Sequence, residues 1–172
     1  PRPILLGAGW VLGNLYYFFI AKMRRRAVEH MMPALGIDET EAKKLVRASF
    51  INMARNVLDI LAMPMLNEKN LSDYIEIDHL ERMQEALAEG RGVVVLTGHV
   101  GCWEWLSAAF TLNGMPVSAI AKPQPNIQYT RALDDLRATI HVEIFSRGTS
   151  ELIAAARALK RGRLLGFLAD QD

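Results

Sequence analysis

The sequence has a single cysteine, Cys102, among its 172 residues, and it has almost no net charge. One cysteine excludes a disulfide framework and any zinc site built from several thiolates. The 20 Lys and Arg against 19 Asp and Glu argue against a nucleic-acid-binding protein that relies on its overall charge. Internal repeats and low-complexity segments are also absent from the sequence. A hydrophobic content of 51% is enough for a packed core, which excludes intrinsic disorder.

The near-neutral total conceals a pattern along the chain. Residues 1–60 and 122–163 are basic, whereas residues 61–121 are acidic. Such blocks suit a protein with one basic face near anionic groups, although an ordinary mixed surface gives the same pattern. Because the sequence starts at Pro1 and stops at Asp172 directly after an apolar run, we expect it to be a piece of a longer protein.

The first apolar segment, residues 4–21, contains no charged side chain. A helix of this length is about 27 Å long, close to the thickness of a bilayer core. Trp10 and Tyr16 are aromatics of the kind found at membrane interfaces, and a basic run over residues 22–26 follows at once. The pattern predicts a membrane-associated helix that spans the bilayer or lies in its interface, with the rest of the chain on the cytoplasmic side. A buried core helix is the alternative.

Small residues mark one side of this segment, since Gly7, Gly9 and Gly13 form a stripe that favours close packing on another helix. Residues 39–63 have apolar residues at helical spacing and are followed by Pro64. This second segment predicts an amphipathic helix that packs in the core or rests against anionic headgroups.

Strands and helices are predicted to alternate from residue 92 onward. The β-branched apolar run over residues 92–97 predicts a buried parallel strand, and strands are also expected over 116–121, 142–145 and 163–169. Helices are expected over 78–90, 103–112, 128–138 and 150–160. This alternation predicts an α/β layer fold. We place the domain boundary at residue 88, so that residues 89–172 are the first part of the α/β domain and residues 1–88 are helical.

The segment GHVGCWE over residues 98–104 follows the first predicted strand, at the end of a parallel sheet where ligands bind. Glu104, in the first turn of the next predicted helix, is expected to reach the imidazole of His99. A carboxylate on one imidazole nitrogen fixes the tautomer and leaves the other nitrogen free as a general base. From the spacing alone, the alternative is that His99 caps the helix. No metal site is expected, because two ligands without a third are too few.

Cys102 lies three residues from His99 and has two interpretations. A Cys–His nucleophile would make the protein a thioesterase or hydrolase. A small, buried side chain is favoured instead, because nothing in the sequence marks a stabilised thiolate. The sequence contains no GxSxG nucleophile elbow and no GxGxxG phosphate-binding loop.

Taken together, these motifs resemble the bacterial lipid A biosynthesis acyltransferase family. The resemblance is carried by GVVVLTGHVGCWEW, AKPQPN, residues 136 and 137, and RGRLLGFLADQD, and it includes the N-terminal apolar helix and the basic run. The His-x4-Glu motif is also similar to that of the wider glycerolipid acyltransferases. Cys102 and Lys122 stand where the family commonly has Asn and Arg, and residues 140–141 stand where a Gly often follows the Arg.

The resemblance implies a glycerolipid-acyltransferase-like fold of αβα layers, preceded by the membrane-associated helical segment. It also implies a reaction, the transfer of a fatty acyl chain from acyl carrier protein or acyl-CoA to a hydroxyl of a lipid A precursor or related glycolipid. No cofactor, metal or nucleic acid is implied, and the expected location is the cytoplasmic face of the inner membrane. The alternative function is that of a non-catalytic lipid-binding or scaffold module.

The resemblance also implies roles for individual residues. His99 is the expected general base, and Glu104 is expected to orient it. The backbone N–H groups around Cys102 and Trp103 are candidate oxyanion donors. The remaining substrate-binding candidates are three basic residues that would bind acceptor or carrier phosphates, and one carboxylate at the end of the last strand that would organise the site: Arg137, Lys122, Arg147 and Asp170.

Overall fold

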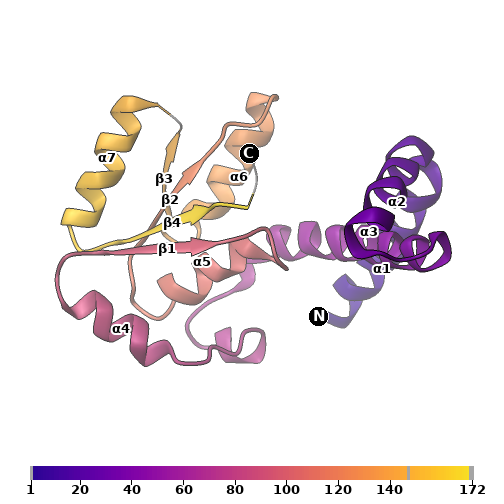
Figure 1. Ribbon diagram of the computed structural model, residues 1–172. Coiled ribbons are helices and arrows are strands. Elements are labelled where there is room, and N and C mark those ends of the chain that lie inside the picture. Colours follow the sequence, from indigo (N-terminus) through magenta and orange to yellow (C-terminus); the bar gives the residue numbers. More distant parts are fainter. Residues whose placement is uncertain (1, 147, 171–172) are drawn as a thin grey trace. The chain divides into compact units, whose positions relative to one another are not determined.

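The structure, a computed structural model, describes residues 2–146 and 148–170 (Figure 1). The chain forms two compact units, residues 1–59 and residues 60–172. The first unit consists of the helices α1 (Arg2–Phe19), α2 (Ala21–Leu35) and most of α3 (Glu39–Leu61). The second unit contains the parallel sheet and the helices around it.

In the helical unit, α1 packs closely on α3 through the predicted glycine stripe. A Cβ added at Gly13 would lie 2.4 Å from the Cα of Ile51, so no larger residue fits without moving a backbone. The buried Asn14 accepts a 2.7 Å hydrogen bond from Nε of Arg47 across the same interface. The glycine stripe is therefore an interface between two helices of the chain, although Gly7 has open space around it.

The rest of the α1 surface is apolar and exposed, with Phe18 and Phe19 being 61% and 81% accessible. Helix α2 begins after a break at Ile20 and is bent by 91° from α1. Among the described residues, no single helix is both long and apolar enough to cross a membrane. The bent pair α1–α2, taken together, meets both criteria by length and composition alone.

The sheet unit contains four parallel strands, β1 (Val93–Thr97), β2 (Val117–Ala121), β3 (Glu143–Ser146) and β4 (Leu164–Leu168), in the order β1-β4-β2-β3. The prediction of an α/β fold with a parallel sheet is therefore confirmed. The β1–β4 pairing runs to Thr97 and Leu168. The β2–β4 pairing stops at Ala119 and Gly166, although both strands continue to Ala121 and Leu168.

Helices cover both faces of this sheet (Figure 1). On one face lie α4 (Leu80–Ala88), α5 (Trp103–Thr111) and α6 (Ile127–Ala138), and on the other lies α7 (Thr149–Lys160). Phe110 of α5 packs with Val117 and Leu164 of the sheet, whereas Ala155 and Ala158 of α7 pack on Phe145 and Leu165. This alternation of side chains along each strand is what a sheet buried on both faces requires.

Residues 60–88 belong to the sheet unit in the structure, while the sequence placed the boundary at residue 88. Short 3-10 turns over Met63–Met65 and Leu71–Asp73 precede α4. Met63 and Leu66 are buried against Trp105 and Ile140, which explains why this stretch stays with the sheet. Apolar side chains of α4 join the core under β1 in the same way.

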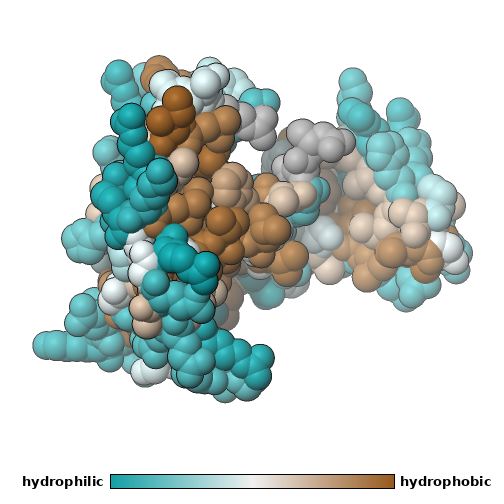
Figure 2. All heavy atoms as spheres, turned by 60° about the vertical axis from the view of Figure 1, so that its left-hand side comes forward, coloured by the Kyte–Doolittle hydropathy of each residue, from teal (hydrophilic) through white to brown (hydrophobic). Residues whose placement is uncertain are grey.

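The edge strand β1 is only partly covered on the α7 face, because Val94 and Leu96 are exposed. Leu152 and Ile153 on α7 are exposed as well. Figure 2 shows hydrophobic side chains gathered on the sheet unit in the view that brings this side forward. The covered face of β1, which carries Val95 and Thr97, points instead toward the site described next.

Candidate active site

The candidate site is built around His99 and Asp170, which follow the adjacent strands β1 and β4. Oδ1 of Asp170 lies 2.8 Å from Nδ1 of His99, and Oδ2 accepts a 2.7 Å hydrogen bond from the backbone N–H of His99. Both oxygens of one carboxylate therefore hold one residue, although 71 positions separate the two in sequence. Gly98 permits this approach, since a Cβ there would lie 3.0 Å from Oδ2 of Asp170.

The charge state of Asp170 suits this contact. The backbone N–H of His99, and then its imidazole, hold the pKa of the Asp170 carboxyl below its ordinary value. An ionised carboxylate can only accept hydrogen bonds. Its contact with Nδ1 therefore favours the tautomer in which Nδ1 carries the proton, and the lone pair of Nε2 stays available. The rings of Trp103 and His99 meet in an edge-to-face arrangement with a centroid distance of 4.7 Å, which also limits how the imidazole can turn.

The predicted contact between His99 and Glu104 is wrong, because both oxygens of Glu104 accept from another residue. Arg137 donates from Nε to Oε2 at 3.0 Å and from Nη2 to Oε1 at 2.6 Å. Among the described residues, the carboxylate on the His99 ring is that of Asp170. The spacing brought Glu104 to the first turn of α5, as expected, but its side chain points to α6, where Arg137 lies in the last turn.

The Glu104–Arg137 pair is largely buried, with side chains 8% and 15% accessible. Asp134 accepts a further bond from Nη1 of Arg137 at 3.2 Å. Burial by itself would lower the pKa of Arg137, but the hydrogen bonds and charge of Glu104, followed by those of Asp134, raise it above the ordinary value. The pair is a forked, charge-assisted contact that holds the start of α5 to the end of α6.

A cavity of about 530 Å³ opens beside these residues. Its polar lining includes His99, Trp103 and Glu104 from the β1–α5 connection, together with Lys122 and Arg137. Its apolar lining comes from the sheet and from α5 and α6: Val95, Leu106, Phe110, Val117, Leu133, Val142, Ile144 and Leu164. A cavity of this size, lined by apolar side chains and a few polar groups, suits the binding of a small, partly apolar ligand beside His99.

The other predicted site residues differ in their relation to this cavity. Lys122 follows β2, is exposed, and lines the cavity. Cys102 is half-buried at the cap of α5 and packs against the core that contains Trp105. Arg147 lies outside the described residues. In the described part of the chain, no group of three His, Cys, Asp or Glu side chains could hold a metal ion.

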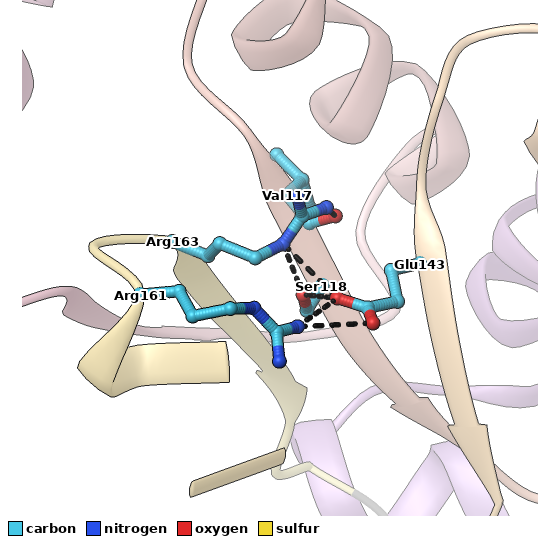
Figure 3. A network of polar contacts seen from close by, with 5 residues as sticks. All are labelled: Val117, Ser118, Glu143, Arg161 and Arg163. Carbon is cyan, nitrogen blue, oxygen red and sulfur yellow. Dashed lines mark hydrogen bonds and ion pairs between the residues drawn. The ribbon is translucent and has the colours of Figure 1, made fainter. Parts of the chain in front are cut away.

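A second polar network, which the sequence analysis did not identify, lies at the amino ends of the strands (Figure 3). Glu143 accepts bonds from Ser118 at 3.0 Å and from Arg161 at 2.9 and 3.0 Å, and it pairs with Arg163 at 3.1 Å. Arg163 also donates to the backbone oxygen of Val117 at 2.6 Å. The network therefore ties β2, β3 and the start of β4 together.

The contact between His99 and Asp170 can be predicted from the sequence only if the order of the strands in the sheet is known. Both residues come within two positions of the end of a predicted strand, and the carboxyl ends of parallel strands lie at one edge of a sheet. Which strands are neighbours depends on the chain's path through the fold, however. From the sequence alone, the expected partner of His99 is therefore Glu104, five residues away, rather than Asp170.

Comparison with known proteins gives two further findings. A family model described as bacterial lipid A biosynthesis acyltransferase matches residues 1–172. A phosphatidylinositol mannoside acyltransferase from Mycolicibacterium smegmatis is 25% identical over 91 residues. That match covers 52% of this chain but 30% of the relative, so it spans less than a third of the relative's own length.

Proposed function

The chain belongs to the bacterial lipid A biosynthesis acyltransferase family, and we propose that it is a membrane-associated O-acyltransferase. It moves a fatty acyl chain from acyl carrier protein or acyl-CoA to a hydroxyl of a lipid A precursor or a related glycolipid. The observation that carries the proposal is the His99–Asp170 contact beside a cavity of about 530 Å³ that apolar side chains of the sheet, α5 and α6 help to line. The family supports acyl transfer in general, and the cavity supports a fatty acyl substrate.

His99 acts as the general base through Nε2. Asp170 holds the proton on Nδ1 and stabilises the imidazolium that forms when Nε2 takes the proton of the acceptor hydroxyl. The oxygen then attacks the thioester carbonyl and forms a C–O bond. As the tetrahedral intermediate collapses, the C–S bond breaks and the imidazolium returns the proton to the leaving thiolate. No covalent acyl-enzyme is formed, so the mechanism makes no use of the Cys102 thiol.

The oxyanion of this intermediate needs hydrogen-bond donors close to the base. Helix α5 begins at Trp103, directly after Cys102, and the first N–H groups of an α-helix have no carbonyl partner within the helix. The backbone N–H group at Trp103 is therefore a proposed oxyanion donor, and the family resemblance adds that of the neighbouring Cys102 to the proposal. Glu104 and Arg137 keep this turn in place through their forked contact, as positioning residues.

Charged groups that line the cavity select the polar ends of the substrates. Lys122 is exposed there, and we assign it to a phosphate of the glycolipid acceptor or of the carrier's phosphopantetheine arm. Arg147 keeps its proposed role in the same binding step. Because Arg137 already serves two carboxylates, its own contribution is to position Glu104 as well as to add positive charge at the cavity.

The helical unit supplies the proposed membrane contact at the cytoplasmic face of the inner membrane. Trp10, Phe18 and Phe19 are exposed on the surface of α1, and the basic run of α2 includes Arg24 and Arg25. An apolar helix followed by basic residues binds a bilayer that contains anionic lipids. This contact would hold the chain at the membrane that contains the proposed lipid acceptor.

The test is an acyl-transfer assay on the intact protein with labelled acyl-CoA or acyl carrier protein and a glycolipid acceptor. We expect His99→Ala to lower the rate by about 10²–10⁴-fold, because a general base contributes an effect of that size. Cys102→Ser is the matched control in the same turn and keeps most of the activity. If Cys102→Ser abolishes transfer and the labelled acyl group stays on the protein, the mechanism is that of a thiol nucleophile instead. If the wild type transfers no acyl chain to any glycolipid, the proposed function is wrong.

A further inference from the structure

Where the two central strands of the sheet line the cavity, each contributes a small residue at its middle position: Gly166 on β4 and Ala119 on β2. One row across the sheet consists of Val95, Gly166, Ala119 and Ile144, as the pairing register shows. All four line the cavity. Central strands of a buried parallel sheet are normally rich in large branched residues, so Gly166 and Ala119 leave space where a core would be filled.

The sheet also opens at this row. The pairing between β2 and β4 ends at Ala119 and Gly166, although both strands continue. Ile120 and Phe167, the next residues, belong to the core beneath α7 and yet also line the cavity. The cavity therefore reaches between the two strands directly beyond their last paired residues.

The row lies between two lining residues of β4 that stand at opposite ends of the strand. Leu168 pairs with Thr97, two residues before His99, whereas Leu164 packs with Phe110. Gly166 lies halfway, about 7 Å along the strand from each, since a strand rises about 3.3 Å per residue. His99, this row and Phe110 all line the same cavity, so a ligand that extends along β4 from His99 toward Phe110 passes the row.

A side chain at Gly166 would be tolerated by the backbone. The nearest atom to an added Cβ, apart from chain neighbours, is the carbonyl oxygen of Ser118 at 3.7 Å, which is ordinary van der Waals contact. The residue also lies outside the left-handed region of φ. Neither close packing nor backbone conformation therefore requires glycine here, and the open space is the feature that its absence of a side chain provides.

We propose that Gly166, with Ala119 beside it, sets the length of acyl chain that the protein accepts, by keeping the passage past the middle row of the cavity open. This inference rests on the proposed function, because it takes the apolar ligand to be an acyl chain. A larger residue at either position closes the passage and leaves space only for a shorter chain.

The experiment compares Gly166→Ala and Gly166→Val with the wild type, in the intact protein. The donors are saturated acyl-coenzyme A thioesters of increasing length, from octanoyl to stearoyl. We expect Gly166→Val to lower kcat/KM for the longest accepted donor relative to shorter ones by about tenfold or more, since one methylene in an apolar pocket changes discrimination by roughly ten- to two-hundredfold. Gly166→Ala gives a smaller shift in the same direction, and it remains informative if the valine variant folds poorly.

Two further variants control for general effects. Val142→Ala enlarges the cavity beside Phe110 and Leu164, against which Val142 packs, and we expect it to shift the preference toward longer donors. Val94→Ile adds a methylene on the exposed face of the neighbouring strand, away from the cavity, and leaves the preference unchanged. A shift of the same size in Val94→Ile would overturn the proposal.

Binding of non-hydrolysable thioether analogues of the same donors separates the inference from the proposed function. If transfer and analogue binding both keep the wild-type length preference in Gly166→Val, the inference is overturned while the function stands. If the wild type transfers no chain but binds the analogues with a preference that Gly166→Val shortens, the inference stands and the proposed function is wrong. If the wild type neither transfers nor binds any chain, both are overturned.

Discussion

Arginine and carboxylate side chains meet at both ends of the same parallel sheet, in two networks of different character. At the carboxyl ends, Glu104 and Arg137 are largely buried and line the cavity beside His99. At the amino ends, Glu143 is 38% accessible and joins Arg161 and Arg163 (Figure 3). Of the described residues that line the cavity, none is a charged member of this second network.

The comparison shows that a cluster of charges by itself does not indicate a site. The amino-end network satisfies its own donors and acceptors and ties strand ends together, which is a structural role. The carboxyl-end network adjoins an imidazole with one nitrogen held by a carboxylate, and a cavity with room for a substrate. The distinction predicts that substitutions at the two ends change different measured quantities.

The largest effect is expected for Glu104→Ala, which leaves the buried Arg137 guanidinium without its forked partner. Breaking a buried ion pair by removing one side costs about 3–5 kcal/mol of the free energy of unfolding. Urea denaturation of the variant measures this cost. Asp134→Ala, which removes the more exposed partner of the same guanidinium, is the control and costs less than about 1 kcal/mol. Equal losses in the two variants would show that the pair is not the buried anchor described here.

The next largest effect is expected for Asp170→Asn, and it is a change in the reaction rate rather than in stability. The amide keeps the size of the side chain, but its NH₂ group can donate to Nδ1 and so favour the tautomer with the proton on Nε2. We expect kcat to fall by about a hundredfold or more while KM changes little, because a misplaced proton disables a general base. Steady-state kinetics across pH measure the split. An unchanged pH–rate profile for kcat would contradict the assignment of Asp170 to the base.

A smaller effect on stability alone is expected at the amino ends, in Glu143→Gln. The variant keeps the side-chain shape but weakens the bonds to Arg161 and Arg163, which are partly exposed and screened by solvent. A loss of about 1 kcal/mol in the free energy of unfolding is expected, with kcat/KM unchanged. A fall in kcat/KM of tenfold or more would break the contrast between the two ends.

The smallest effect is a dependence on pH at the carboxyl ends. His99 holds the pKa of Asp170 below its ordinary value, so the ionised carboxylate stabilises the folded protein. This stabilisation is complete above the ordinary aspartate pKa of about 3.9 and is lost as the pH falls through the lowered folded-state pKa. The difference in Tm between wild type and Asp170→Asn should therefore shrink below about pH 4. A difference in Tm that grows on acidification would show that the ionised Asp170 carboxylate does not stabilise the folded protein.

Much of the sheet unit could be predicted from the sequence, because its elements follow local patterns. The four strands lie within one residue of their expected bounds, and α5 to α7 agree similarly. β-branched apolar runs and helical spacing depend on near neighbours in the chain, which a single sequence contains. Helix α2 was missed, because its basic run has little apolar periodicity and Pro33 lies within it.

The partners of the site residues could not be predicted in the same way. Glu104 is close to His99 in sequence, yet its carboxylate meets Arg137 on α6. Asp170 was expected at the end of the last strand, but its contact with His99 follows from β4 lying beside β1. Such contacts depend on the order of strands in the sheet, and residue spacing does not encode that order.

The place of β4 in the sheet has a consequence for how the protein reaches its working form. Strand β4 is the last of the four to be synthesised, yet it lies between β1 and β2. While the chain is being made, β1 has no partner strand among the four, and the pairing of β1 must wait for a segment about 70 residues later. Contacts of such long separation in sequence form slowly and leave apolar strand surface open to aggregation. The insertion of β4 joins β1 to β2 and brings Asp170 to His99 in the same step, so the contact at the imidazole forms only once these strands have paired.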